Sequence, residues 1–425
     1  MIEEHAIKEI PKAGWPIVRL ESVVQRMSNG ITKRQSKDGI GVRVSRIETI
    51  SHGRVNLERV GFLQGLTAGE IENFRLRPGD VLFSHINSDI HLGKTAIYTL
   101  DGELLLHGMN LLLLRPDEAA VIPQWLHWLF NHYRSAGHFI DIAQHAVNQS
   151  SINQAKLKAL EIPLPPLDVQ HLIVDEIEKQ FSRIDAGVAA LKRVEASLKR
   201  YRAAVLKAAC EGWLCAGGQP ESIESNREWK TLKIEDACDR IVDCLHSTAK
   251  FAAVGRYCLD TTWIKPGKII YEKARCVDDA TFDDRNRRMR PSAGDVVFSR
   301  EGTIGVAVAL PSGIDVCLGQ RMMVFRLKDS VHPSFFEAYL NSDTFKAHYK
   351  KDISGSVSPH LNISSIRNYP IRIPPIDAQE TIVNEIQRRL SVVEEVEAAV
   401  SANLKRACRL QQAVLQKAFS EGASE

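Results

Sequence analysis

The chain has 425 residues, of which 44% are hydrophobic and 25% charged, enough to bury at least two ordinary cores, so we expect more than one domain. No segment approaches the roughly 20 apolar residues that span a bilayer, and the N-terminus carries acidic residues where a signal peptide carries basic ones, so we expect a cytoplasmic protein. The formal net charge of +3 is nearly neutral, so any nucleic-acid binding must use basic groups gathered on one face.

The first globular domain is predicted over residues 1–158. Runs of branched and apolar residues bounded by Gly, Pro, Asn or Asp predict strands at 41–47, 80–83 and 110–115. A proline followed by helically spaced aromatic residues and leucines predicts a helix at 123–138. The domain is therefore expected to be mixed α/β.

A long helix is predicted in the region 159–214, after Pro165 and Pro166. Apolar residues recur every seventh position, which is typical of a coiled-coil seam. The first column is Ile177, Ile184, Leu191, Leu198 and Val205, and the second is Val174, Phe181 and Val188 before it shifts to Val194 and Tyr201. A helix of roughly 45 residues is about 65 Å long.

The second half of the chain repeats the first. Gly79 to Ser84 matches Gly294 to Ser299, and Pro165-Pro166 matches Pro374-Pro375. The repeat predicts a second globular domain at 215–368, with strands at 295–298 and 320–327 and a helix at 333–350. A second long helix is predicted in the region 369–425. Its columns are Ile386, Val393, Val400, Ala407 and Val414, with Leu390, Leu404 and Leu410 beside them.

A long helix with one apolar stripe needs a partner, and the copy in the other half is the nearest one. The expected fold is α+β: two pseudo-repeated globular α/β domains separated by two long antiparallel coiled-coil helices. The alternative is that each helix folds back on its own domain.

The eight cysteines show none of the two-residue separations typical of a zinc ribbon, so we predict reduced, mostly buried thiols and no metal site. Gly93-Lys94-Thr95 is similar to the end of a phosphate-binding loop, but Ser88 stands where that loop needs its first glycine. No dinucleotide-binding glycine motif follows a strand. The sequence therefore predicts no catalytic residues.

Three features of the sequence are typical of one known family: the two Pro-Pro openings, each followed by a long helix, the segment from Gly294 to Gly305, and the segment from Ile241 to Ala249. The openings are Leu164-Pro165-Pro166-Leu167-Asp168-Val169-Gln170 and Ile373-Pro374-Pro375-Ile376-Asp377-Ala378-Gln379. In these features the chain closely resembles the specificity subunits of type I restriction-modification systems.

The resemblance implies a non-catalytic, sequence-specific subunit that binds a bipartite site on double-stranded DNA, with one target-recognition domain for each half-site. It also implies that the helices act as a spacer and dock modification (methyltransferase) and restriction subunits, with S-adenosylmethionine, ATP and magnesium held by those partners. Two other classes stay open: a self-contained restriction or methylation enzyme, and a coiled-coil scaffold that does not read DNA.

Candidate DNA-contacting residues are basic and amide side chains in the loops of the two domains, because Arg, Lys and Asn can bind base edges and phosphates. In the first domain they are Lys33, Arg34, Lys37, Arg43, Arg46, His85 and Asn87. In the second they are His246, Lys250, Arg285, Arg287, Arg288, Arg300 and His360. Such charge runs are often only solvated faces, and an isolated histidine is as often structural. His85 stands where the second half has Arg300, so the domains are expected to read different bases.

Overall fold

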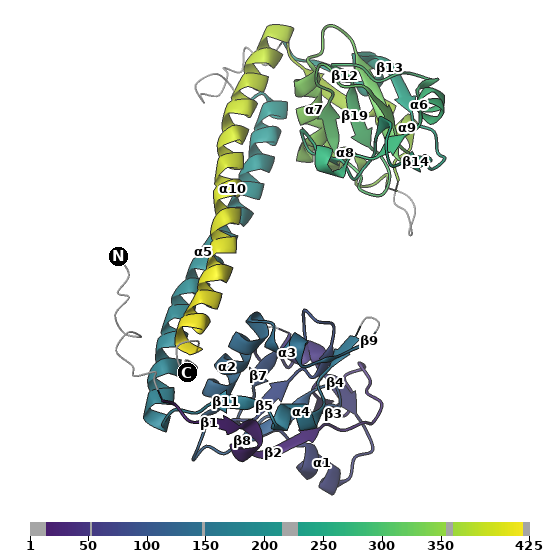
Figure 1. Ribbon diagram of the computed structural model, residues 1–425. Helices are drawn as coiled ribbons and strands as arrows, with labels where there is room; N and C mark the ends of the chain where they lie inside the picture. Colours follow the sequence, from purple (N-terminus) through teal and green to yellow (C-terminus); the bar gives the residue numbers. More distant parts are fainter. Residues whose placement is uncertain (1–13, 52, 147–148, 215–227, 354–359, 420–425) are drawn as a thin grey trace. The chain divides into compact units, whose positions relative to one another are not determined.

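The computed structural model describes residues 14–51, 53–146, 149–214, 228–353 and 360–419 (Figure 1). Contacts divide the chain into two compact units, Met1–Leu191 with Ala402–Glu425, and Lys192–Ser401. Each unit therefore holds one globular domain and a part of each long helix. None of the helices within the described ranges combines the length and apolar character that crossing a bilayer requires.

The first domain is built on a four-stranded antiparallel sheet in the order β2-β8-β5-β7. These strands are β2 (Val24–Asn29), β8 (Leu112–Pro116), β5 (Val81–Phe83) and β7 (Thr95–Ile97). Smaller sheets pair β1 (Ile17–Arg19) with β11 (Glu161–Pro163) and β3 (Val42–Val44) with β4 (Gly61–Leu63). In a third, β10 (Gln149–Ser151) lies between β6 (Ile86–Asn87) and β9 (Gln144–Ala146) and pairs with both. The helices are α1 (Ala68–Phe74), α2 (Pro123–Ser135), α3 (His138–Asp141) and α4 (Gln154–Lys158).

The second domain repeats this plan with the sheet order β13-β22-β19-β20. These strands are β13 (Cys238–Asp243), β22 (Met322–Leu327), β19 (Val296–Ser299) and β20 (Ala307–Ala309). A second four-stranded sheet contains β14 (Phe251–Ala252), β18 (Cys276–Val277), β15 (Arg256–Leu259) and β21 (Val316–Leu318). β12 (Lys230–Lys233) pairs with β23 (Pro370–Ile373), and β16 (Ile264–Lys265) with β17 (Lys268–Ile269). The helices are α6 (Asp279–Asn286), α7 (Pro333–Asn341), α8 (Asp343–Tyr349) and α9 (Ile363–Asn368).

The same buried ion pair joins the middle strands of both main sheets. Asp80 accepts two hydrogen bonds from Arg115, at 2.7 and 2.8 Å. Asp295 accepts two from Arg326, at 2.9 and 2.7 Å. Since both aspartates are almost fully buried, removing either partner would leave an uncompensated charge. The repeated Gly-Asp motif is thus explained by a structural ion pair that both domains use.

The predicted helix at 333–350 is divided into α7 and α8. Ser342 has an extended backbone, and its hydroxyl accepts a hydrogen bond from the amide of Phe345 at 3.2 Å. A side chain that caps a new helix in this way ends the preceding one. The prediction of one continuous helix over 333–350 is therefore wrong at Ser342.

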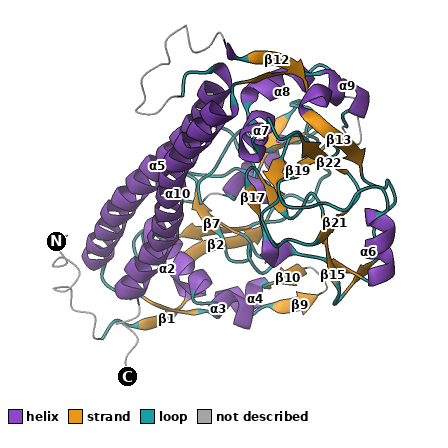
Figure 2. Ribbon diagram, turned by 90° about the horizontal axis from the view of Figure 1, so that it is seen from above, coloured by secondary structure: helices purple, strands orange, loops and turns teal. Residues whose placement is uncertain are grey.

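The two long helices are α5 (Leu167–Glu211) and α10 (Ile376–Phe419), which lie side by side in both views (Figures 1 and 2). In the first unit Asp185 of α5 accepts a hydrogen bond from Gln411 of α10 at 3.0 Å. In the second unit Arg202 of α5 pairs with Glu397 of α10 at 3.1 Å. Later residues of α5 thus meet earlier residues of α10, and the pairing is antiparallel as expected.

The first apolar column of α10 is buried from Ile386 to Ala407. That of α5 is buried at Ile177 and Val205 but half-buried between them, and parts of the second columns are exposed. Val393 and Val400 are 2% and 5% exposed. Val194, Tyr201 and Leu410 are exposed side chains instead. Polar neighbours take the places of Tyr201 and Leu410 in the seam. A straight helix drifts relative to a strict seven-residue repeat, and a polar pair can replace an apolar one there. These neighbours are Arg202 and Gln411, whose partners lie on the opposite helix.

Each end of the helix pair also packs on the domain of its own unit. Phe419 of α10 contacts Trp125 of α2 with ring centroids 5.0 Å apart, in the same buried cluster as Ile177 of α5. In the second unit Leu206 and Ile382 share a cluster with Phe335 of α7. The helices therefore pair with each other, as expected, and they also pack on the domains, as in the alternative, at their ends.

Most described cysteines are buried, as expected: Cys210, Cys238, Cys244, Cys258 and Cys317 are buried, whereas Cys276 is half-buried and Cys408 exposed. All seven are free thiols. The described residues contain no group of three or more His, Cys, Asp or Glu side chains that could hold a metal ion.

Candidate nucleic-acid interface

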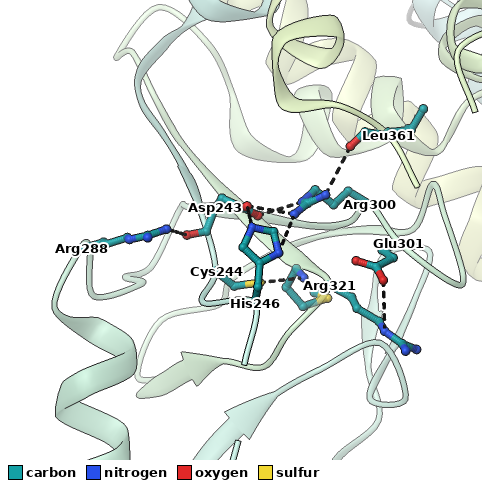
Figure 3. Close-up of polar contacts among 9 residues, drawn as sticks. Asp243, Cys244, His246, Arg288, Arg300, Glu301, Arg321 and Leu361 are labelled. Atoms are coloured by element: carbon teal, nitrogen blue, oxygen red, sulfur yellow. Dashed lines mark hydrogen bonds and ion pairs between the residues drawn. The ribbon is translucent and has the colours of Figure 1, made fainter. Parts of the chain in front are cut away.

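Figure 3 shows a polar cluster around Asp243, at the end of β13 in the second domain. The carboxylate accepts hydrogen bonds from Nε of Arg300 at 2.8 Å and from Nη2 at 2.9 Å. Burial disfavours the charge on Arg300, but the hydrogen bonds and attraction from Asp243 outweigh it and raise the pKa of the guanidinium. With only 6% of its side chain exposed, Arg300 has no free edge with which to contact DNA.

His246 and Arg288 lie around this ion pair at the surface. Nε2 of His246 is 3.1 Å from Asp243 Oδ2, and 69% of its side chain is exposed. Arg288 is exposed and donates to the backbone oxygen of Asp243 at 3.3 Å. The buried Asp243–Arg300 pair therefore fixes the position of a surface that carries two further donors.

A tight turn beside this cluster presents Arg321, the only described non-glycine residue with a positive φ, 75°. Its backbone oxygen accepts from the amide of Arg300 at 3.1 Å, and its guanidinium is 3.8 Å from Glu301. The left-handed region is disfavoured for side chains with a Cβ, and such strain concentrates at functional sites. The hydrogen bond to the amide of Arg300 thus fixes the backbone of Arg321, whose side chain is exposed.

The first domain has an equivalent turn. Phe83 pairs with Leu112 in the first sheet and Phe298 with Met323 in the second, so the positions two residues earlier correspond: Asn110 and Arg321. Both residues are exposed. The two domains therefore present different side chains from the same turn.

The predicted cations of the first domain lie at the surface, and most have acidic neighbours. Lys33 pairs with Glu70, Arg43 with Glu103 and Arg46 with Glu48, each at 2.7 Å, and Lys37 lies 3.9 Å from Glu48. Arg34 is exposed. Exposed ion pairs contribute only about 0–1 kcal/mol, so phosphates can compete for these cations. Their contact with DNA stays a prediction.

The two other predicted residues of this domain have different surroundings. His85 is buried, and burial lowers its pKa to about 4, so it is neutral at pH 7 and offers no charge to a phosphate. Asn87 is half-buried, and its amide donates to Ser84 at 3.3 Å. His85 occupies the position that Arg300 has in the second domain, and both side chains are buried there.

The remaining predicted residues of the second domain divide by exposure. Arg285 is buried and donates to the carbonyl oxygens of Ser247 and Leu318, which indicates a structural role. Lys250 and Arg287 are exposed, Arg287 at 3.1 Å from Asp284. His360 is half-buried and forms a β-bridge with Glu301. The structure thus brings His246, Arg288 and Arg300 together around Asp243.

The sequence reasoning missed Asn110 and Arg321. A signal for them does exist: each lies two residues after a glycine, Gly108 or Gly319, and shortly before a β-strand. A Cβ at Gly108 would clash with the carbonyl oxygen of Ser45, so this glycine permits a close backbone approach. Aligning the two halves through these glycines would have paired the two turns.

The family model described as "Type I restriction modification DNA specificity domain" matches the chain twice, at residues 12–195 and 226–405. The type I restriction enzyme MjaX specificity subunit of Methanocaldococcus jannaschii is 29% identical over 411 residues, covering 90% of this chain and 88% of the relative. The EcoKI specificity subunit of Escherichia coli is 22% identical, covering 96% and 88%. One similar solved structure has a description that names complex assembly and conformational transition of the type I R-M system. It matches with a TM-score of 0.69 and 18% identity, covering 96% of this chain and 97% of the solved one.

Proposed function

Because the chain belongs to the type I restriction-modification DNA specificity family and carries the family's domain twice, we propose that it is the subunit that reads a bipartite DNA site. Each domain reads one half-site in duplex DNA. The paired helices α5 and α10 set the separation between the two readers.

One observation carries the assignment of readers: the sheet register places Asn110 in one domain where the other domain has Arg321. In the major groove, arginine makes bidentate contacts with guanine, and asparagine with adenine. A duplicated domain with different side chains at one fixed position suits a protein that reads two different half-sites. His246 and Arg288, beside Arg321, supply further contacts to bases or phosphates.

Catalysis belongs to partner subunits in this proposal. The modification subunits dock on the paired helices and supply methyl transfer with S-adenosylmethionine, and the restriction subunit uses ATP and magnesium. The complex acts in the cytoplasm. The absence of catalytic motifs in the sequence supports this division, as do the names of the relatives, which are specificity subunits.

The test is selection of binding sites from random duplex DNA by the chain assembled with its partner subunits. Arg321→Ala is expected to relax one base position of one half-site by about 1–3 kcal/mol, roughly 5- to 150-fold, and Asn110→Ala to relax one position of the other. Lys230→Ala is the control, because this exposed cation lies on β12, outside both main sheets.

Equal relaxation of both half-sites by either variant would contradict the assignment of one reader to each domain. Unchanged selection by both variants would remove the two turns from the interface. Methyl transfer by the purified chain without partners would instead support the self-contained enzyme.

A further inference from the structure

A cavity of about 880 Å³ lies within the first unit, between the domain and the long helices. Its wall includes Lys94 and Thr95 at the start of β7, Trp128, Asn131 and Arg134 on α2, and, on α5, Phe181 and Ser182. A pocket of this volume accommodates a small organic or inorganic ligand. None of the residues predicted to contact DNA lies in this wall.

The wall holds three cations, Arg54, Lys94 and Arg134. Of these, Lys94 and Arg134 lie near each other and have no acidic partner among the described residues. Lys94 donates only a long hydrogen bond to the carbonyl oxygen of Ser51, at 3.4 Å. Within the described ranges, neither Lys94 nor Arg134 forms an ion pair with a carboxylate. Burial lowers the pKa of both groups, and repulsion from Arg134 lowers that of Lys94 further. The protein thus holds two like charges near each other in a partly desolvated place, which costs free energy unless an anion binds.

Two buried N–H groups belong to side chains of this wall and have no acceptors. Nε of Arg134 and Nε1 of Trp128 are buried and have no hydrogen-bond partner among the described residues. A buried N–H without a partner costs about 1–3 kcal/mol, so each such group in a folded protein requires a physical cause. A ligand with several acceptor oxygens would neutralise the two charges, and it would satisfy these two donors once the Trp128 and Arg134 side chains turn toward it.

Among the described residues, the second domain lacks this pair of cations, although the scaffold is duplicated. The register of the sheets aligns Thr95 with Ala307, so Val306 stands in the place of Lys94. The helices α2 and α7 both begin at proline, and this alignment puts Ala338 in the place of Trp128, whereas the position of Arg134 falls beyond Asn341, where α7 ends. The corresponding cavity there measures about 330 Å³. The charges of the first cavity are therefore not needed to build the fold.

We propose that this cavity binds a phosphate group, held by Lys94 and Arg134 with Trp128 as a neutral donor. A phosphate carries the negative charge and the several acceptor oxygens that this set of donors requires. The carboxylates of Glu178 and Asp185 line other parts of the wall, and Asp185 is engaged by Gln411 at 3.0 Å. The site is not a nucleotide-binding loop, since Ser88 replaces the necessary glycine.

The phosphate has two possible sources, the backbone of bound DNA and free phosphate in solution. Only the DNA source rests on the proposed function. The experiment compares the full chain with Lys94→Gln and Arg134→Gln, and uses Arg59→Gln as the control, because Arg59 is an exposed cation of the same domain outside the cavity. Binding of inorganic phosphate is measured by calorimetry and by the rise in melting temperature with phosphate concentration. Binding to specific duplex DNA is measured against salt concentration.

A free-phosphate site predicts that both variants weaken phosphate binding about tenfold or more and lose the phosphate-dependent rise in melting temperature, with DNA binding unchanged. A DNA-phosphate site predicts weaker DNA binding and a salt dependence whose slope falls by about 1 for each variant, with no change in base preference. Without any ligand, Lys94→Gln is expected to melt no lower than the parent, because it removes a repulsion. If both variants behave like Arg59→Gln in both assays, the proposal is wrong. A loss of melting temperature in Lys94→Gln without ligand would show that the cation is structural, which also overturns it.

Discussion

Replacing Arg300 with methionine tests whether this side chain holds the second domain together or reads DNA. The substitution keeps much of the side-chain volume but removes both hydrogen bonds to Asp243. The side chains of Arg300 and Asp243 are only 6% and 10% exposed, so the remaining carboxylate would be buried without a counter-charge. Breaking a buried ion pair in this way costs about 3–5 kcal/mol.

The assay is amide hydrogen exchange of the full chain at neutral pH, followed in peptides from β13, β19 and β22. The slowest amides of these strands report the opening of the domain, so a loss of about 3–5 kcal/mol accelerates their exchange by roughly 10²- to 10³-fold or more. Arg287→Met is the control, since this exposed arginine has only a surface partner and should change stability by less than about 0.5 kcal/mol.

A second variant separates the ion pair from other effects of the substitution. Adding Asp243→Asn to Arg300→Met removes the unpaired charge, so the double variant should lose less free energy than the sum of the two single variants. If Arg300→Met left exchange unchanged and removed recognition of one half-site, the arginine would be a reader and its structural role would be refuted.

Two further predictions concern Glu337 and the helices. Burial raises the pKa of Glu337 from 4.5 to about 7, so its contribution to the stability of the second domain is complete below about pH 4.5 and is lost as the pH rises through 7. Glu337→Gln should abolish this part of the pH dependence, about 3 kcal/mol between pH 4.5 and 8, in denaturant unfolding curves; parallel pH profiles for parent and variant would contradict it. A seven-residue insertion after both Leu191 and Val400 lengthens each helix by about 10 Å. This corresponds to about three base pairs and a rotation of roughly 100°, so a longer preferred spacer with weaker binding, or loss of specific binding, is expected in selection from random-spacer DNA with the partners present. Recovery of the parental spacer at parental affinity would mean that the helices do not measure the gap.

The periodic and repeated parts of the fold could be predicted from the sequence. The column from Ile386 to Val400 marks a buried stripe on α10, because apolar residues seven positions apart lie on the same face of a helix. The exposure of Tyr201 and Leu410 could not be predicted, since the polar side chains that replace them, Arg202 and Gln411, have partners on the other helix. Arg202 and Glu397 are 195 positions apart, and composition alone does not pair them.

The site was harder to predict for the same reason. Arg300 follows a strand in a basic and glycine-rich segment, which is typical of a surface loop, but it is buried because Asp243 arrives from another strand. Arg285 is buried because two carbonyl oxygens accept its hydrogen bonds. Conversely, Arg321 is presented to solvent by a backbone conformation that residue type does not reveal. The charged segments of the sequence therefore indicate the region of the candidate interface, but they do not indicate which side chains in that region are exposed.

The contacts between the long helices have a consequence for self-association. Arg202–Glu397 and Asp185–Gln411 each join α5 to α10, so the polar positions of the seam favour unlike helices over two copies of the same one. Since both helices belong to one chain, their encounter is unimolecular, with an effective concentration on the order of millimolar. A second chain at micromolar concentration competes poorly with such a partner. Cutting the backbone between Leu214 and Glu228 would make the same encounter bimolecular, and pairing of the two halves would then depend on their concentration.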